Sequence, residues 1–424
     1  MEVGTVSAES AGDKAEKRAQ EIASRLGIAD FVYGQPLVRK GRGWREVGDG
    51  LLVVANSGAI LQVKSREPTQ GLRDSKEKAE RVARKYIEAA IRQGYGSKRT
   101  IQSHVTDGKP LSAIPVRAHD YPTVDSQDFA LELSGSCERW PIIVILDHPR
   151  NPSFSVSVPP GIFCISLLDW ERLHEYTRSV SGILRYIDAV FESRLPTVIG
   201  REEKRFAELV GLIQPELPGR RESHPWFSTA ARDDPVGVSI YRELLSKAWT
   251  GLPRGPGISP EEVRTILAFL DDVPTSVMAK IGRWILRKRR EFKETGKLAS
   301  GAVITGNKIL VYLHGSEQQC SDQMQWTSEL TFLTLTRLHE WTETYNTKAV
   351  ALGVGTRETE GGIEYTHVYL EGAGGLTKDI RDTIEWKYGV HNFRFGHVRR
   401  YEPGRNAMCP CRSGKKYKRC HGGR

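Results

Sequence analysis

Three cysteines and a histidine lie close together near the end of the sequence, in the stretch NAMCPCRSGKKYKRCHGG. A single proline separates Cys409 from Cys411, and Cys420 is followed directly by His421. Three thiolates and one imidazole form the closed tetrahedral ligand set that is typical of structural Zn²⁺. A fully ligated ion leaves no position for a substrate, so these residues predict a zinc-stabilised binding surface. The alternative is a cysteine-rich tail without metal.

A second group of polar residues lies in the stretch DGLLVVANSGAILQVKS, which predicts two apolar strands around an Asn-Ser-Gly turn. Pairing outward from a turn with Asn56 and Ser57 at its tip places Asp49 opposite Lys64. Gln62 shares the face of Lys64 because side chains alternate along a strand. A carboxylate, an amide oxygen and an ammonium group would then meet at one end of the hairpin. Such a set could bind a divalent cation and act on a phosphodiester.

The helix expected before this hairpin, over residues 13–27, can add another carboxylate. Glu16 shares a helix face with Ala19 and Ala23, so we expect it on the packed side. Glu21 instead has a basic residue one turn away on either side, the pattern of a solvated face. We therefore expect Glu16, and not Glu21, to join the polar group of the hairpin.

The elements that position these residues predict an α/β (α+β) protein. A second helix is expected from about Asp74 to Gly94, followed by strands in LSAIPVRA, PIIVILDH and GIFCISLLDW, and by a helix from about Leu168 to Arg194. Residues 195–300 have a helical pattern that includes the basic amphipathic run RWILRKRREFK. Residues 301–375 predict a strand, a long helix and two more strands, and TKDIRDTIEWKYG predicts a final helix.

The helix and hairpin resemble the PD-(D/E)xK nuclease superfamily, whose core runs helix, three strands, helix, strand. Its motif has an acid on the second strand and (D/E/Q)-x-K on the third, matched here by Asp49 and by Gln62-Val63-Lys64. Glutamine at this position is the variant of Mrr-like restriction endonucleases, which also carry a glutamate on the first helix, matched by Glu16. The resemblance covers about residues 13–120. The structural alternative is an ordinary strand pair with an Asp at one end and a Lys at the other.

This resemblance implies four catalytic residues: Glu16, Asp49, Gln62 and Lys64. A catalytic Mg²⁺ or Mn²⁺ would be held by Asp49, the side-chain oxygen of Gln62 and Glu16. Lys64 would position or deprotonate the attacking water, or stabilise the charged phosphate. Because Gln62 replaces the usual carboxylate, the site has one negative charge fewer and we expect weaker resting metal affinity.

The C-terminal stretch resembles the SEC-C motif, which is the zinc-binding tail of the preprotein-translocase motor ATPase and of many other bacterial proteins. The family pattern is close to C-P-C-G-S-G-K-K-[YF]-K-x-C-[CH], and only Arg412 departs from it, at a position where Gly is usual. The resemblance implies Zn²⁺ bound by Cys409, Cys411, Cys420 and His421. It also implies docking to a protein, a ribosome or nucleic acid.

Five regions are expected: a disordered N-terminus (1–12), a nuclease-like domain (13–198), a helical region (199–300), an α/β domain of unknown role (301–398) and the zinc module (399–424). The other cysteines, Cys137, Cys164 and Cys320, lie in apolar surroundings and are predicted to be buried free thiols.

The charge distribution favours a polyanionic partner. The net charge is +10, and residues 399–424 contain nine Lys and Arg against one Glu. The simpler alternative is that these charges only keep the tail solvated. The sequence starts without a signal-peptide pattern and has no apolar run of membrane-spanning length, so we expect a cytoplasmic protein.

Two functions are compatible with these patterns. The first is a metal-dependent nuclease, acting on DNA in preference to RNA because Mrr-like proteins restrict foreign DNA, with a role in defence. Cutting both strands usually needs two active sites, which favours a homo-oligomer. The second is a non-catalytic scaffold that uses a degenerate nuclease fold and the SEC-C tail to bind a ribosome, a chaperone or nucleic acid.

Overall fold

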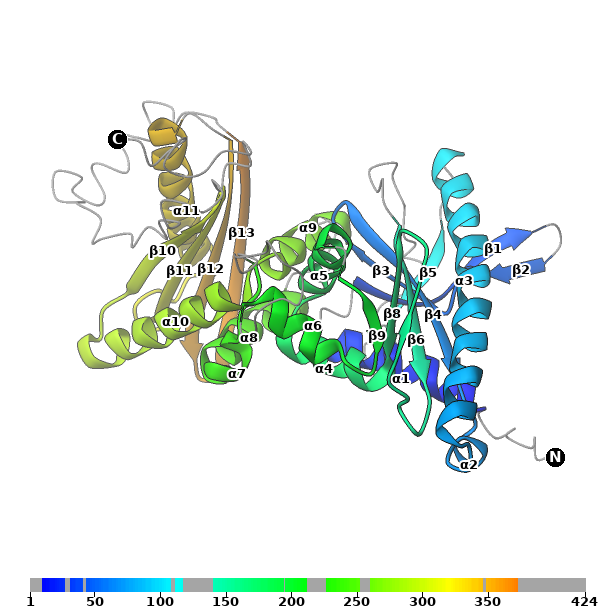
Figure 1. Ribbon diagram of the computed structural model, residues 1–424. Helices are drawn as coiled ribbons and strands as arrows, with labels where there is room; N and C mark the ends of the chain where they lie inside the picture. The colour runs from blue at the N-terminus through cyan, green and yellow to red at the C-terminus, as the bar shows by residue number, and fades with distance from the viewer. Residues whose placement is uncertain are drawn as a thin grey trace, which may run out of the picture. The chain divides into compact units, whose positions relative to one another are not determined.

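The computed structural model describes residues 10–26, 31–40, 43–107, 111–116, 140–193, 195–211, 226–251, 260–345 and 348–372. The chain forms two compact units, residues 1–233 and 234–424. Each unit contains its own β-sheet with helices packed on it, so the protein is of mixed α/β class (Figure 1). The expected helix in TKDIRDTIEWKYG and the whole zinc module lie outside the described residues.

The first unit contains helices and strands in an alternating order. Its elements are α1 (Ala11–Leu26), β1 (Val32–Lys40), β2 (Gly43–Glu46), β3 (Gly50–Val54), β4 (Ser57–Ser65), α2 (Pro68–Gly71), α3 (Lys76–Thr106), β5 (Ser112–Pro115), β6 (Ile142–Asp147), β7 (Phe154–Val156), β8 (Ile162–Ser166), α4 (Leu167–Thr177), α5 (Val180–Ser193), β9 (Thr197–Ile199), α6 (Glu202–Leu209) and α7 (Ala230–Asp233).

A seven-stranded mixed sheet forms the centre of this unit, with strand order β2-β1-β3-β4-β6-β8 and β5 paired to β1. The pairs β1–β3 and β3–β4 are antiparallel, whereas the pairs β4–β6 and β6–β8 are parallel. The connection from β4 to the parallel strand β6 passes through α3, as parallel pairing requires a crossover. The carboxyl ends of β4 and β6 therefore lie at the same edge of the sheet.

Helices cover both faces of this sheet. Alternate residues of β4, β6 and β8, among them Ile60, Val144 and Cys164, pack with Ala83 and Ile87 of α3 in one core cluster. Residues of opposite parity face the other layer, where the ring of Phe163 contacts Tyr186 of α5 and Trp170 of α4 donates a hydrogen bond to the carbonyl of Ala19 in α1. Strands buried on both faces are apolar throughout, which explains the uninterrupted run IIVIL in β6.

The register of the β3–β4 hairpin differs from the expected one. Val54 pairs with Ser57 and Gly50 with Leu61, so the two-residue turn consists of Ala55 and Asn56. Ala55 adopts a left-handed conformation (φ +47°) that sequence rules assign to glycine or asparagine, which explains the error. One further step along this register brings Asp49 opposite Gln62, and the expected pairing with Lys64 is wrong.

Two expected helix boundaries are also wrong. The second helix does not stop at Gly94 but continues to Thr106, because Gly94 is buried where α3 passes close to Ile142 of β6. The helix expected from about Leu168 to Arg194 is divided into α4 and α5. Arg178 takes a left-handed conformation (φ +54°) at the end of α4, which turns the chain out of the helix.

The second unit packs helices on a four-stranded sheet of order β10-β11-β12-β13. Its elements are α8 (Pro235–Gly251), α9 (Pro260–Asp271), α10 (Thr275–Thr295), β10 (Ala299–Thr305), β11 (Lys308–Ser316), α11 (Gln323–Tyr345), β12 (Ala349–Thr359) and β13 (Gly362–Gly372). The strand β10 was not expected. The basic run predicted as amphipathic belongs to α10, which buries Ile281, Ile285 and Phe292 and exposes Arg287 and Arg290.

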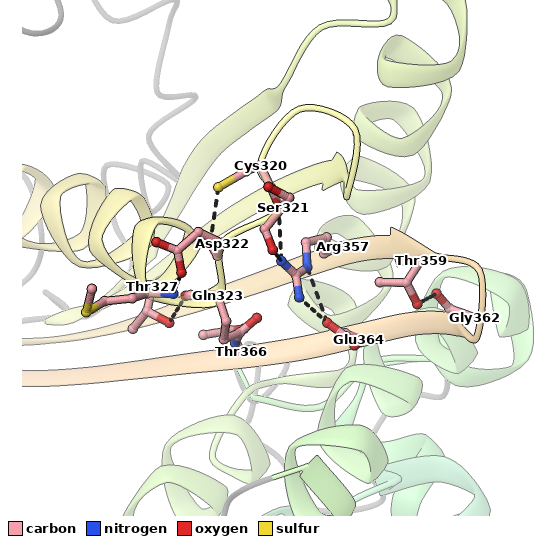
Figure 2. Close-up of polar contacts among 11 residues, drawn as sticks. Cys320, Ser321, Asp322, Gln323, Thr327, Arg357, Thr359, Gly362, Glu364 and Thr366 are labelled. Carbon is pink, nitrogen blue, oxygen red and sulfur yellow. Dashed lines mark hydrogen bonds and ion pairs between the residues drawn. The ribbon is translucent and has the colours of Figure 1, made fainter.

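A buried arginine joins three segments of this second unit. Arg357 of β12 donates hydrogen bonds to the Glu364 carboxylate on β13 (Nη2–Oε2 2.5 Å) and to the carbonyls of Cys320 and Ser321 (3.0 and 3.2 Å) before α11 (Figure 2). Its side chain is 7% exposed, so this charge needs all of these partners. The arginine thereby anchors the start of α11 to the β12–β13 hairpin.

Two further expectations can be compared with the described residues. Cys164 and Cys320 are buried free thiols, as expected, whereas Cys137 lies outside the described residues. No helix among the described residues is long and apolar enough to cross a membrane.

The contact between α8 and α10 predicts the effect of a single methyl group. Gly237 and Gly282 face each other, and a Cβ on Gly282 would overlap the carbonyl group of Gly237. We expect Gly282→Ala to lower the free energy of unfolding of the second unit by about 1–3 kcal/mol, because two helix backbones would have to separate. Denaturant or thermal unfolding followed by circular dichroism measures this.

The matched control is Gly96→Ala in α3, where an added Cβ has no neighbouring atom within 4 Å. This change should be neutral or stabilising by up to about 1 kcal/mol, since alanine favours the helix over glycine. Equal stability of both variants would contradict the close approach of α8 and α10.

Candidate active site

Asp49 lies in the loop directly before β3, and its position depends on β4 and α1. One carboxylate oxygen, Oδ2, accepts a hydrogen bond from the backbone N–H of Val63 (2.6 Å) and lies 3.9 Å from Nζ of Lys64. The backbone carbonyl of Asp49 accepts a hydrogen bond from Gln20 of α1 (2.5 Å). The Asp49 side chain is only 17% exposed, so the carboxylate is largely removed from water.

Gln62 lies between Asp49 and the core of the sheet. It is buried (2% exposed), and its amide nitrogen packs against Gly48, where an added Cβ would lie 3.1 Å away. Gly48 has φ +84°, a conformation in which other residues are strained. This glycine turns the chain so that Asp49 points toward β4, and the sequence Gly-Asp-Gly at 48–50 was a signal that could have indicated this.

Glu16 reaches this site from α1 in the layer opposite to α3. It is half-buried and accepts a hydrogen bond from Gln35 of β1 (3.4 Å), while Ala15 and Ala19 beside it are buried. Glu21 is exposed, as expected. The structure thus places Glu16 close enough to Asp49 and Lys64 for their charges to interact. Gln62 lies opposite Asp49 in the β3–β4 register, in place of the expected Lys64.

The two carboxylates of this site are both harder to ionise than usual. Burial, followed by the charge of Asp49, raises the pKa of Glu16 to about 7, against the lowering effects of the Gln35 hydrogen bond and of Lys64. Burial also raises the pKa of Asp49, against the effects of the Val63 N–H and of Lys64. The two carboxylates therefore share the positive charge of Lys64. Because both pKa values remain raised, this charge does not fully offset the cost of burying the ionised carboxylates.

The residue types of this site suit a divalent cation, which would supply the positive charge that the two carboxylates need. Carboxylate and amide oxygens are ligands that Mg²⁺ and Mn²⁺ accept, and a site with few protein ligands keeps room for water and phosphate oxygens. The described residues contain no group of three or more His, Cys, Asp and Glu side chains arranged for a metal ion. The candidate set has two such residues, with Gln62 as the third oxygen donor.

A second charged cluster lies beyond Lys64 and was not recognised in the sequence. Asp74, fully buried, pairs with Arg66 of β4 (3.2 Å) and with Lys78 of α3 (2.7 Å). His148, just after β6, lies 3.7 Å from the same carboxylate, and no hydrogen-bond partner for its buried Nε2 is found among the described residues. Either Asp74 or Ser75 can cap this helix from the sequence, and Ser75 does so by accepting a hydrogen bond from the N–H of Lys78.

The second unit contains a chain of buried polar side chains. His314 is buried and its Nδ1 lies 2.8 Å from the hydroxyl of Thr356. Tyr312 shares this hydroxyl (2.7 Å) and accepts a hydrogen bond from Arg289 (3.1 Å). This network joins β11, β12 and α10, and it has the character of a structural core.

The predicted zinc ligands Cys409, Cys411, Cys420 and His421 lie outside the described residues. Comparison with known protein families supports the predicted SEC-C motif, since residues 405–423 match the SEC-C motif family. The protein therefore carries a C-terminal SEC-C motif, which commonly binds metal, namely zinc.

Another comparison finds a partial relative. A UPF0225 protein from Serratia proteamaculans (strain 568) is 33% identical over 63 residues, which is 15% of this chain. The aligned part spans 41% of that relative, less than half its length. No solved structure matches the chain.

The raised pKa of Glu16 predicts how stability depends on pH. Its folded-state pKa of about 7 exceeds the usual 4.5, so the stability that protonated Glu16 contributes is present at low pH and is lost as the pH rises through about 7. We expect wild-type protein in EDTA to lose more thermal stability between pH 5 and pH 8 than Glu16→Gln. Added Mg²⁺ at pH 8 should restore part of the wild-type loss. Parallel melting-temperature profiles of the two proteins would contradict the assignment.

The SEC-C match predicts zinc in the purified full-length protein. Metal analysis should find one zinc ion per chain, because three thiolates and an imidazole complete a tetrahedral site. Cys411→Ser and Cys420→Ser should each abolish most of this zinc. Cys320→Ala, which changes a buried free thiol of the second unit, should retain it. Zinc content that is equal in all variants would show that the ligands lie elsewhere.

Proposed function

We propose that this protein is a metal-dependent nuclease that hydrolyses phosphodiester bonds, with DNA as the preferred substrate. The observation that carries the proposal is the proximity of Glu16 and Asp49 to Lys64 at the end of β4, where two carboxylates with raised pKa values share one lysine and Gln62 lies opposite Asp49. Titratable groups perturbed by burial and by a specific partner are characteristic of functional sites.

The arrangement of the elements supports the proposal. The order α1, β1, β3, β4, α3, β6, with β1, β3 and β4 antiparallel and β6 parallel to β4, is compatible with the helix, three strands, helix, strand order of a PD-(D/E)xK core. Asp49 precedes the second of these strands, and Gln62 and Lys64 lie on the third. The short strand β2 is an addition at the edge of the sheet. The SEC-C match does not bear on these residues.

The side chains can divide the work of hydrolysis among them. A bound Mg²⁺ or Mn²⁺ would neutralise charge on the phosphate and make a coordinated water more acidic. Asp49, Gln62 and Glu16 offer the oxygen ligands. The ammonium group of Lys64 can donate hydrogen bonds to a phosphate oxygen or orient a water molecule. Cation binding would require Glu16 to release its proton near pH 7, so binding should strengthen as the pH rises.

Exposed basic residues favour a nucleic-acid substrate. Several lie along α3 and just before it: Arg73, Lys76, Arg81, Lys85 and Arg92. This helix covers the face of the sheet to which Gln62 and Lys64 belong, because both alternate with Ile60 along β4 and Ile60 packs against α3. Cations on such a surface would bind backbone phosphates irrespective of sequence. The SEC-C tail would act as a docking module. A role in defence against foreign DNA is part of the proposal by analogy with Mrr-like enzymes.

A non-catalytic binding protein is the second candidate. Gln62 stands in place of a carboxylate, and Asp49 is already engaged by the Val63 N–H and by Lys64. In that case the same fold would bind nucleic acid, a ribosome or a chaperone without cleaving a phosphodiester.

Cleavage of plasmid DNA and of RNA in the presence of Mg²⁺ or Mn²⁺ distinguishes the two candidates. Asp49→Asn and Lys64→Ala should each reduce the rate by about 10²-fold or more, because each removes a charge from the reacting phosphate or its metal. Glu21→Gln, an exposed glutamate on the same helix as Glu16, is the matched control and should leave the rate unchanged. Cleavage that persists in both site variants would contradict the proposed site. A wild-type protein that binds nucleic acid but never cleaves it would favour the second candidate.

A further inference from the structure

The first unit contains a cavity of about 360 Å³ between the small β7–β9 sheet and α6. It is not lined by any of the four proposed catalytic residues. The walls include Ser153 and the ring of Phe154, and one side consists of Arg201, Lys204, Arg205 and Glu208. These last four residues follow the helical pattern i, i+3, i+4, i+7, so they form one face of α6 and its N-terminal cap.

The three basic residues of this face differ in their exposure and in their contacts. Arg205 lies at the back of the cavity, 5% exposed, and is neutralised by a forked pair of hydrogen bonds to Glu202 (2.9 and 2.5 Å). Arg201 is exposed and uses only Nε, in a hydrogen bond to the hydroxyl of Ser153 (3.1 Å). Among the described residues its two terminal nitrogens have no hydrogen-bond partner. Lys204 is exposed beside it.

The cavity is polarised along the helix. Arg201 and Lys204 are at its N-terminal end, and Glu208 lies about 10 Å along the axis from Arg201 and about 6 Å from Lys204. The apolar ring of Phe154 adds a wall to this space. A fitting ligand therefore has a doubly charged anionic head, an apolar or planar body and a hydrogen-bond donor at the far end. A guanidinium group beside an ammonium group suits a phosphate in particular.

We propose that this cavity binds a phosphomonoester of about mononucleotide size, with its phosphate at Arg201 and Lys204. Two sources have this chemistry: a free nucleoside monophosphate and the 5′-phosphate end of a nucleic-acid strand. The volume is within the range of ordinary small-molecule sites. The site would sense or retain phosphorylated ends or nucleotides, independently of hydrolysis at Asp49.

Calorimetric titration of the full-length protein tests this proposal. The ligands are adenosine 5′-monophosphate, adenosine, inorganic phosphate, and a short oligonucleotide with either a 5′-phosphate or a 5′-hydroxyl. Measurements use Asp49→Asn in EDTA, which prevents cleavage and keeps this site separate from the proposed nuclease site. We expect saturable binding of the monophosphate or of the 5′-phosphorylated strand, at least about tenfold tighter than of the partner without the phosphate.

The variants identify the residues involved. Arg201→Ala combined with Lys204→Ala should weaken binding at least about tenfold, and Glu208→Gln should weaken the nucleotide but not inorganic phosphate. Arg287→Ala, an exposed arginine of the second unit, is the control and should bind normally. Binding of the free nucleotide identifies it as the source, whereas binding of the 5′-phosphorylated strand alone identifies the strand end. No saturable binding of either, equal binding without the phosphate, or unchanged binding by the double variant would each overturn the proposal.

Discussion

The antiparallel pairing of β3 with β4 is the constraint on which the candidate site depends. With Gly50 opposite Leu61, the residue before β3 comes within hydrogen-bonding distance of the Val63 N–H, and that bond holds the Asp49 carboxylate 3.9 Å from the Lys64 ammonium. A shift of one residue would turn every side chain of β4 to the opposite face and bury Lys64 in a different layer. The two-residue turn at Ala55 and Asn56 fixes this register, so the geometry of the hairpin also sets the geometry of the polar site.

Two clusters of charge in the same unit show how the surroundings decide what a carboxylate can do. Lys78 and Arg66 hold the pKa of Asp74 below its ordinary value, so this buried carboxylate is fully compensated and acts as a structural anchor. Burial raises the pKa of Glu16 and of Asp49, which share the positive charge of Lys64. The cluster around Asp49 therefore lacks positive charge, whereas the cluster around Asp74 does not. A divalent cation would supply that charge, which is why the site around Asp49, and not the one around Asp74, is the candidate for chemistry.

Much of this arrangement could be predicted from the sequence because it depends on local patterns. The apolar hairpin and the helix face that carries Glu16 follow from side-chain periodicity, and a family resemblance suggests the four candidate residues. The register could not be predicted, because it depends on the left-handed conformation of Ala55, which its residue type disfavours. Gly94 was mistaken for a helix end because its role, a close approach to Ile142, is visible only in the packed structure. The partnership of Asp74 with Arg66 and Lys78 joins a strand, a loop and a helix, and no spacing rule predicts it.

The proposed function depends on a divalent cation bound by Asp49, Gln62 and Glu16 beside Lys64. Crystals of the full-length protein grown with Mn²⁺ test it most directly, since anomalous scattering locates the ion without assumptions about activity. The account predicts an Mn²⁺ ion roughly 2–2.5 Å from an Asp49 carboxylate oxygen, with Gln62 or Glu16 as a further ligand. Saturating Mn²⁺ with no peak at Asp49, and with the Asp49–Lys64 ion pair left as it is, would contradict the account.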